Sequence, residues 1–299
     1  FQEEHDYDGD SIIDWGAYST FNIAGLLLKK EQYNDGIING TFHIGEYYTY
    51  DDNGYQLTYE KEFDGDGVAE YIQHYTYDAN GNILSDEEDG DSYYGGSDGI
   101  FDNIKYYTYD EENNKLSKEQ DYSGDGVIDY AEYFSYDNNS NMLTQEYDFE
   151  NDNIIDIRNT YEYDVNNNMV LWEKDGLMSG SDADGVVDFV EYHTYDGDGK
   201  RLSEERDGDI YTGGADGVID FGEYHNYDEN GNKISYTQYE NGILNGSLYY
   251  SEFYTYDSNG NVISKEQDGS RYSGGADGVV NVIESYSYDS NGYIISEQI

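Results

Sequence analysis

The chain has 299 residues, and its 66 Asp and Glu outnumber its 14 Lys and Arg, so the formal net charge is -52 at pH 7. This acidity excludes the basic surface that binds DNA or RNA, and no apolar run reaches the roughly 18 residues that a membrane-spanning helix needs. The absence of cysteine excludes disulfides, and an aromatic content of 17% favours strands over disorder.

One short phrase, a Tyr-Asp pair that opens a turn, recurs along the whole chain. Successive copies lie 27 to 32 residues apart, and the first copy is a degenerate Phe21-Asn22. The other anchors are Tyr50, Tyr77, Tyr109, Tyr136, Tyr163, Tyr195, Tyr227, Tyr256 and Tyr288. A period of this length indicates tandem structural repeats, so we predict a single tandem-repeat domain over residues 1–299.

Each anchor is predicted to begin a β-hairpin. Asn259-Gly260 lies between two strand-like runs, which favours a two-residue type I′ turn. The predicted cross-strand pairs are Tyr256 with Ile263, Thr255 with Ser264, Tyr254 with Lys265 and Phe253 with Glu266. Strand alternation then places Ser/Thr pairs and Tyr–Glu pairs opposite the face of the anchor. About ten such hairpins predict an all-β fold, an elongated, solenoid-like antiparallel meander with a twisted or spiralling sheet.

Acidic loops separate the hairpins. From Asp121 to Asp129, oxygen-bearing side chains at positions 1, 3, 5 and 9 surround a glycine at position 6, which is the spacing of an EF-hand calcium loop. Ca²⁺ takes six to eight oxygen ligands, and such a loop can wrap them around one ion. The predicted ligands of the short loops are Asp6, Asp8, Asp10 and Asp14; Glu62, Asp64, Asp66 and Glu70; Asp121, Ser123, Asp125 and Asp129; and Asp148, Glu150, Asp152 and Asp156.

Four longer loops carry additional residues between positions 1 and 5, and each keeps Asp-Gly followed by two apolar residues. Their predicted ligands are Asp89, Asp98 and Asp102; Asp175, Asp184 and Asp188; Asp207, Asp216 and Asp220; and Asp268 and Asp277, with Asn281 at position 9. We therefore predict about eight Ca²⁺ sites. Two loops, 34–41 and 240–247, lack the motif and are predicted to be metal-free.

The alternative interpretation of these loops requires no ion, because Asp-Gly-Asp segments also form turns. Eight loops that keep positions 1, 5 and 9 in step with the strands favour calcium. Glu132 stands at position 12, where an EF-hand supplies a bidentate ligand. However, Glu46 and Glu252 occupy the same place after loops without the motif. This glutamate is therefore predicted to belong to the strand pattern and not to the metal site.

The hairpin phrase resembles the YD repeats of RHS-type bacterial surface proteins, most clearly from Tyr77 to Leu84. The resemblance covers nearly the whole chain. It implies a spiralling β-sheet that serves as a shell or a cell-surface stalk. This chain departs from the family pattern in placing calcium-type loops between its hairpins.

Uniform repetition favours a secreted structural protein, a calcium-stiffened filament subunit, stalk or adhesin at an extracellular or cell-surface location. We expect self-association, head-to-tail or edge-to-edge, and neither a nucleic-acid partner nor membrane insertion. The alternative is a carbohydrate-binding module, in which tyrosine rows stack on a polysaccharide and calcium bridges its hydroxyls. Paired carboxylates also permit glycosidase chemistry, but no residue interrupts the repeat as a catalytic site would, so we predict no enzyme.

Overall fold

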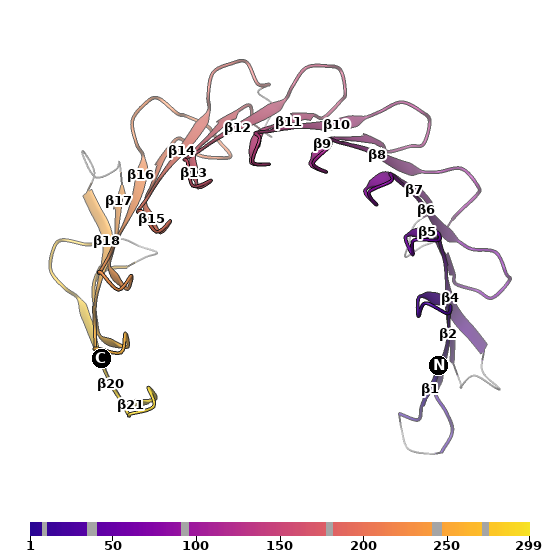
Figure 1. Ribbon diagram of the computed structural model, residues 1–299, viewed down its shortest axis with the longest axis horizontal. Helices are drawn as coiled ribbons and strands as arrows, with labels where there is room; N and C mark the ends of the chain where they lie inside the picture. The colour runs from indigo at the N-terminus through magenta and orange to yellow at the C-terminus, as the bar shows by residue number, and fades with distance from the viewer. Residues whose placement is uncertain (8–10, 35–40, 91–95, 178–181, 241–246, 271–274) are drawn as a thin grey trace. The chain divides into compact units, whose positions relative to one another are not determined.

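The computed structural model describes residues 1–7, 11–34, 41–90, 96–177, 182–240, 247–270 and 275–299. These residues form 21 β-strands, assigned to one antiparallel sheet (Figure 1). The described part of the chain has no helix, so no helix in it could cross a membrane. The predicted all-β antiparallel meander is confirmed.

The strands follow one another in chain order, and most have seven residues, a length of about 23 Å. The first ten are β1 (Gln2–His5), β2 (Trp15–Phe21), β3 (Leu27–Asn34), β4 (Thr41–Tyr50), β5 (Gln56–Glu62), β6 (Tyr71–Tyr77), β7 (Ile83–Asp89), β8 (Asn103–Tyr109), β9 (Lys115–Asp121) and β10 (Tyr130–Tyr136). The others are β11 (Met142–Asp148), β12 (Ile157–Tyr163), β13 (Met169–Asp175), β14 (Phe189–Tyr195), β15 (Arg201–Asp207), β16 (Phe221–Tyr227), β17 (Lys233–Glu240), β18 (Ser247–Tyr256), β19 (Val262–Gly269), β20 (Val282–Tyr288) and β21 (Ile294–Gln298).

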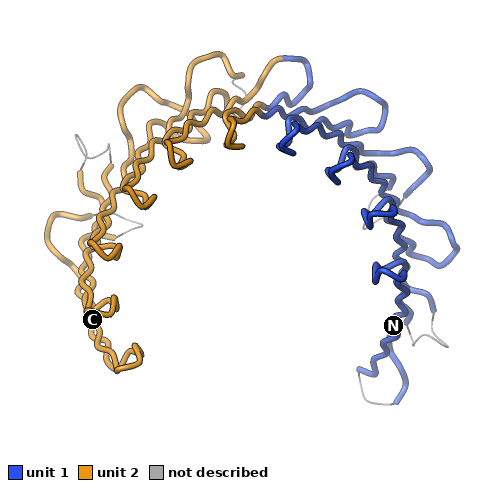
Figure 2. The backbone as a smooth tube through the Cα atoms, viewed as in Figure 1, with its two compact units in different colours: residues 1–134, 147–153 blue, residues 135–146, 154–299 orange. Residues whose placement is uncertain are grey.

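The chain divides into two compact units, residues 1–134 with 147–153 and residues 135–146 with 154–299 (Figure 2). In the first unit β1 to β10 pair with their chain neighbours. In the second unit β12 to β21 do the same. Within each unit the tight turns lie on the inside of a curve, and wide loops between the hairpins project from its outside (Figure 2). A single domain over residues 1–299 stays a prediction.

The strands of the hairpins have the predicted register away from the turn. The confirmed pairs are Thr255 with Ser264, Tyr254 with Lys265 and Phe253 with Glu266. The hydroxyls of Thr255 and Ser264 lie 2.6 Å apart, and Thr49 and Thr58 make the same contact at 2.8 Å. The predicted row of Ser/Thr pairs is therefore present. It lies opposite the anchor face, the name we give to the face that carries the anchor tyrosines.

The predicted pair next to the turn is wrong. Tyr256 pairs with Val262 instead of Ile263, and the register shifts by one residue between Thr255 and Tyr256. Ile263 lies at this bulge and is 40% exposed. The other hairpins whose register is described shift at the same place, next to the anchor. The turn is therefore longer than the predicted type I′ turn.

The aspartate of the Tyr-Asp pair explains the longer turn. The Asp257 carboxylate accepts the N–H groups of Asn259 at 2.8 Å and Asn261 at 2.9 Å. The Asn261 side-chain amide donates to the same carboxylate at 2.9 Å. Gly260 has a φ of 85°, the left-handed conformation that closes a three-residue loop with a bulge. An Asn-Gly signal alone does not reveal this second set of bonds.

The anchor tyrosines connect successive hairpins. The Tyr50 hydroxyl donates to the backbone O of Leu27 at 2.9 Å, and the Tyr256 hydroxyl donates to the backbone O of Lys233 at 2.7 Å. Each acceptor lies in the preceding hairpin. The same bond recurs from Tyr77, Tyr227 and Tyr288. The repeat phrase therefore encodes both a turn and a link between hairpins.

Each unit consists of a single layer of strands (Figure 2), so neighbouring strands provide most of the burial on either face. Among the described residues, 20 polar or charged side chains are buried and only nine hydrophobic ones. Buried polar groups are costly unless they are hydrogen-bonded. The stability of this sheet therefore depends on polar networks more than on an apolar core.

Candidate functional site

The first carboxylate of each acidic loop closes the loop. Asp121 accepts the N–H of Ser123 at 3.1 Å and the N–H of Gly126 at 2.7 Å. Its side chain is almost completely buried. Burial alone would raise the pKa of the Asp121 carboxyl, but the backbone donors, Gly126 before Ser123, lower that pKa below its usual value. Position 1 is therefore an ionised group that organises its own loop.

The longer loops keep this arrangement in spite of their insertions. Asp175 accepts the N–H groups of Asp184 at 3.0 Å and Gly185 at 2.9 Å, which are positions 5 and 6. The same positions donate to Asp148 in a short loop. Equivalent bonds form in the loops that begin at Asp89, Asp207 and Asp268. The structure thus brings together positions 1 and 5 of the long loops, as the alignment of the sequence predicts.

Position 9 accepts the N–H of position 2. Asp129 accepts from Tyr122 at 2.8 Å, and Asn281 does the same for Gly269 at 2.6 Å. The corresponding acceptors are Asp14, Glu70, Asp102, Asp188 and Asp220. Because the amide oxygen of Asn281 makes this bond without a charge, turn formation is sufficient to explain position 9. The backbone hydrogen bonds at position 9 therefore support the alternative interpretation, in which the acidic loops form turns without an ion.

These hydrogen bonds leave lone pairs of the carboxylates available for a cation, since each carboxylate has about four lone-pair sites. One loop gathers three of them: Glu62, Asp64 and Asp66 each offer an oxygen within 4.8 Å of the others. Glu62 is buried and the two aspartates are exposed. An all-oxygen group of this kind fits a hard cation such as Ca²⁺. Elsewhere in the described residues, the predicted loops do not bring three carboxylate oxygens so close together.

The first loop is described only in part. Asp6 accepts the N–H of Ser11 at 2.9 Å, and Asp14 accepts the N–H of Tyr7 at 2.7 Å. Asp8 and Asp10, which are also predicted ligands, lie outside the described residues. So do residues 35–40 and 241–246, the central parts of the two loops predicted to be metal-free. Calcium ligation stays a prediction in every loop.

Glu132 lies on β10, away from the loop that precedes it. It accepts a hydrogen bond from the Tyr130 hydroxyl at 2.6 Å and one from the Lys118 ammonium at 3.3 Å. The side chain therefore belongs to the strand network, as the comparison with Glu46 and Glu252 predicts.

Neighbouring acidic loops stack on one another through their backbones. The N–H of Ala183 donates to the backbone O of Ile155 at 3.0 Å, and the N–H of Ala215 donates to the backbone O of Asp188 at the same distance. A Cβ atom at Gly176, position 2 of its loop, would lie 1.9 Å from the backbone O of the residue after Ile155. The Asp-Gly start of the longer loops is therefore required for this close approach.

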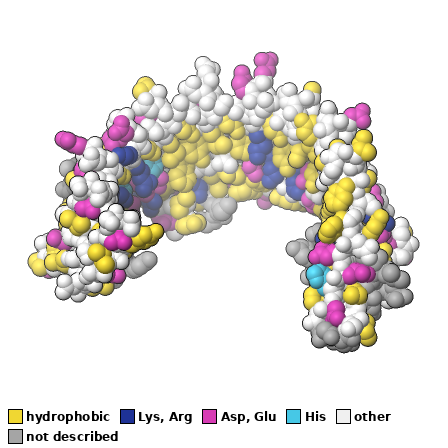
Figure 3. Space-filling view, turned by 60° about the horizontal axis from the view of Figure 1, so that its bottom comes forward, with side chains coloured by type: hydrophobic (Ala, Val, Ile, Leu, Met, Phe, Trp, Pro, Cys, Tyr) yellow, Lys and Arg dark blue, Asp and Glu magenta, His cyan; other side chains and the backbone are white. Residues whose placement is uncertain are grey.

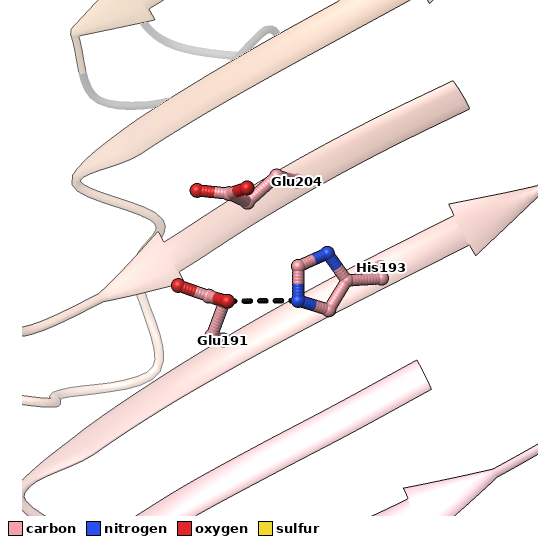
Figure 4. A group of neighbouring side chains, drawn as sticks. All are labelled: Glu191, His193 and Glu204. Atoms are coloured by element: carbon pink, nitrogen blue, oxygen red, sulfur yellow. Dashed lines mark hydrogen bonds and ion pairs between the residues drawn. The ribbon is translucent and has the colours of Figure 1, made fainter. Parts of the chain in front are cut away.

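The structure also assembles a cluster of ionisable side chains outside the acidic loops. Glu191 and His193 on β14 and Glu204 on β15 are all buried, and their candidate ligand atoms lie within 4.8 Å of one another. The His193 Nε2 atom lies 2.8 Å from the Glu191 carboxylate (Figure 4). Glutamate and histidine also occur as ligands in transition-metal sites, so the partners of the carboxylates determine whether the cluster could bind a metal.

Two arginines bind the carboxylates of Glu191 and Glu204. Arg206 bonds to Glu191 at 2.8 Å, and both Arg206 and Arg201 bond to Glu204. Burial alone would raise the pKa of Glu191, but hydrogen bonds from His193 and Arg206 lower it below the usual value. A divalent cation would have to displace both guanidinium groups. The cluster therefore fits an internal ion-pair network better than a metal site. The hairpin register gives a sequence signal for it, because that register places Glu191 opposite Arg206 and His193 opposite Glu204.

No family model matches the chain, and no curated protein matches it. Solved structures do. The crystal structure of TcdB2-TccC3 without the hypervariable C-terminal region matches 93% of the chain with 13% identity and a TM-score of 0.51. The crystal structure of TcdB2-TccC3-Cdc42 matches 92% with 13% identity and a TM-score of 0.50. The chain spans 15% of the length of each of those chains. At this identity the likeness shows a shared β-repeat fold and nothing about activity.

Proposed function

We propose that this chain is a calcium-binding structural repeat protein, a subunit of an extracellular filament, stalk or adhesive matrix. The observation that supports this most is the recurrence of the same contacts from hairpin to hairpin. Anchor tyrosines such as Tyr256 bond to the preceding hairpin, and acidic loops stack on the loops before them. Repeats that bond chiefly to their neighbours suit an extended scaffold.

Calcium has a physical role in this proposal. A net charge of -52 favours expansion of the chain, because like charges repel one another, and bound cations offset that repulsion. The oxygen group of Glu62, Asp64 and Asp66 supports a cation site directly. Loop sites with dissociation constants near the millimolar range match the calcium concentration outside cells, which supports an extracellular location.

Thermal unfolding in calcium and in excess EGTA tests the calcium part of the proposal. We expect calcium to raise the melting temperature, because each site adds about 2.7 kcal/mol when calcium is at 100 times its dissociation constant. Asp64→Asn combined with Asp66→Asn should weaken one site at least tenfold in a calorimetric titration. Glu111→Gln with Glu112→Gln, in a hairpin turn, is the control of equal charge change. A melt that is the same in calcium and EGTA contradicts calcium binding.

A further inference from the structure

A pocket of about 300 Å³ lies on the anchor face of the second unit. Its floor is a row across four adjacent strands: Trp172 on β13 pairs with Glu191 on β14, Glu191 pairs with Arg206 on β15, and Arg206 pairs with Phe221 on β16. Phe189 adds a buried wall, with its ring edge-on to Trp172 at a centroid distance of 5.1 Å. The pocket thus has aromatic groups at its ends and an ion pair between them.

A short loop forms the rim of this pocket. Asp209 and Gly213 exchange two backbone hydrogen bonds, at 3.1 Å and 2.8 Å, which close the loop into a tight bridge. The Lys174 ammonium crosses from β13 and donates to the backbone O of Ile210 at 2.9 Å. Gly208, Asp209 and Ile210 line the pocket. Because the loop is tied at both places, the rim is built before any ligand arrives, which lowers the entropic cost of binding.

The charges at the pocket select against an anionic ligand. Within each unit, Lys and Arg side chains lie among apolar ones on the hollow face (Figure 3). Arg206 lies on the anchor face, opposite Glu191. Arg206 is 2.8 Å from Glu191, and its guanidinium lies 5.3 Å from the centre of the Phe221 ring. Glu191, Asp209 and the net charge of -52 repel an anion, and Arg206 already pairs with the carboxylate that would attract a cation. An uncharged ligand leaves the ion pair intact.

We propose that this pocket binds an uncharged sugar ring. The Trp172 ring, which lines the pocket, offers an apolar surface to the C–H face of a pyranose, whereas the Phe221 ring already carries the Arg206 guanidinium. The carboxylates of Glu191 and Asp209 accept hydrogen bonds from sugar hydroxyls, and Arg206 donates to them; such charge-assisted bonds are the stronger kind. The volume lies at the small end of the roughly 300–1,000 Å³ of ligand pockets, which suits one or two rings. No calcium takes part, so this site is independent of the proposed calcium loops.

Tryptophan fluorescence provides a direct test, because the chain has only two tryptophans, Trp15 and Trp172. In a Trp15→Phe background, Trp172 alone reports on the pocket. The probes are cellobiose, maltose, xylobiose and N,N′-diacetylchitobiose, with a galacturonic acid disaccharide as the charged comparison, all in EGTA. We expect a saturable change in emission with at least one neutral disaccharide, and binding of the charged one at least tenfold weaker. No saturable change with any probe, or tighter binding of the acidic sugar, overturns the proposal.

Single substitutions test whether the sugar binds in this pocket. By ligand-observed NMR, Trp172→Ala and the rim variant Asp209→Asn should each weaken binding at least tenfold, and Trp172→Phe should weaken it less. Asp209 is in an exposed loop, so its variant keeps the test meaningful if Trp172→Ala fails to fold. Tyr211→Ala is the matched control, since Tyr211 is in the same loop, is exposed and does not line the pocket. Unchanged affinity in Asp209→Asn and Trp172→Phe places the sugar elsewhere and refutes the site.

Discussion

The aspartate of each Tyr-Asp pair is a turn residue in this fold. In Asp257, hydrogen bonds from the Asn261 side chain and from backbone N–H groups lower the pKa of the carboxyl below its usual value. The same bonds lower the pKa in other hairpins, at Asp78, Asp110, Asp137, Asp164 and Asp228. Because these carboxylates bind their proton less tightly when folded, their contribution to stability is complete above the unfolded pKa of about 3.9 and is lost as the pH falls through the folded pKa.

The first hairpin shows how to separate the charge of this residue from its hydrogen bonds. There Asn22 accepts the N–H groups of Ala24 at 3.0 Å and Leu26 at 2.9 Å without a charge. We therefore expect Asp257→Asn to keep the fold at pH 7 and to reduce the loss of stability below about pH 4. Carboxyl NMR of the unmodified protein should show Asp257 titrating below about 3.9. Titration at or above the value measured in urea would contradict this assignment.

At the scale of the element, the acidic loops need glycine for two different physical reasons. Gly124 and Gly126 have φ angles of 67° and 84°, so any side chain at either position carries backbone strain. A Cβ at Gly124 would lie 1.5 Å from the backbone O of Phe101 in the preceding loop, whereas a Cβ at Gly126 would meet no atom within 4 Å. Local conformation alone therefore explains Gly126, and only loop stacking explains Gly124.

This difference predicts unequal costs for the same substitution. Gly126→Ala should destabilise by about 1–2 kcal/mol, the cost of a left-handed alanine. Gly124→Ala should cost more, by at least about 2 kcal/mol, because the two loops must also separate. Urea unfolding of the two variants, compared with the unmodified chain, measures both costs. Equal destabilisation would show that the stacking of the loops contributes little.

At the scale of the whole molecule, strand pairing is local: β1 to β10 in one unit and β12 to β21 in the other pair with their neighbours in the chain. We propose that self-association would use exposed strand edges, whose backbone groups can pair with another chain. Repulsion among the acidic groups opposes such an association unless cations reduce the charge. Self-association is therefore expected to depend on calcium.

Electron microscopy of the full chain tests this expectation. We predict end-to-end or edge-to-edge assemblies in millimolar calcium and short, separate particles in EGTA. The combined Asp64→Asn and Asp66→Asn variant should need more calcium to assemble, and the Glu111→Gln and Glu112→Gln control should not. Separate particles in both buffers would contradict assembly, while the melting experiment would still decide whether calcium binds.

The sequence by itself determined the fold class, the repeat and most of the strand register. Thr255 opposite Ser264 follows from alternation, because a slip of one residue would move every side chain to the other face. The turn was predicted one residue too short because the Asp257 carboxylate, in addition to Asn-Gly, defines its hydrogen bonds. A local pattern with a fixed period can be recognised in a sequence. The hydrogen bonds of a side chain that closes its own loop change the turn, but they leave no such pattern.

Only the tertiary structure decided which residues of different hairpins meet. The row from Trp172 to Phe221 depends on the register between β13 and β14 and between β15 and β16, which acidic loops connect. Those loops vary in length, and their register depends on how they stack, as at Gly176. Hairpin turns set the register of two strands within a few residues. The contacts of particular side chains across two hairpins also depend on backbone hydrogen bonds between loops of different length, which a pattern within one repeat does not specify.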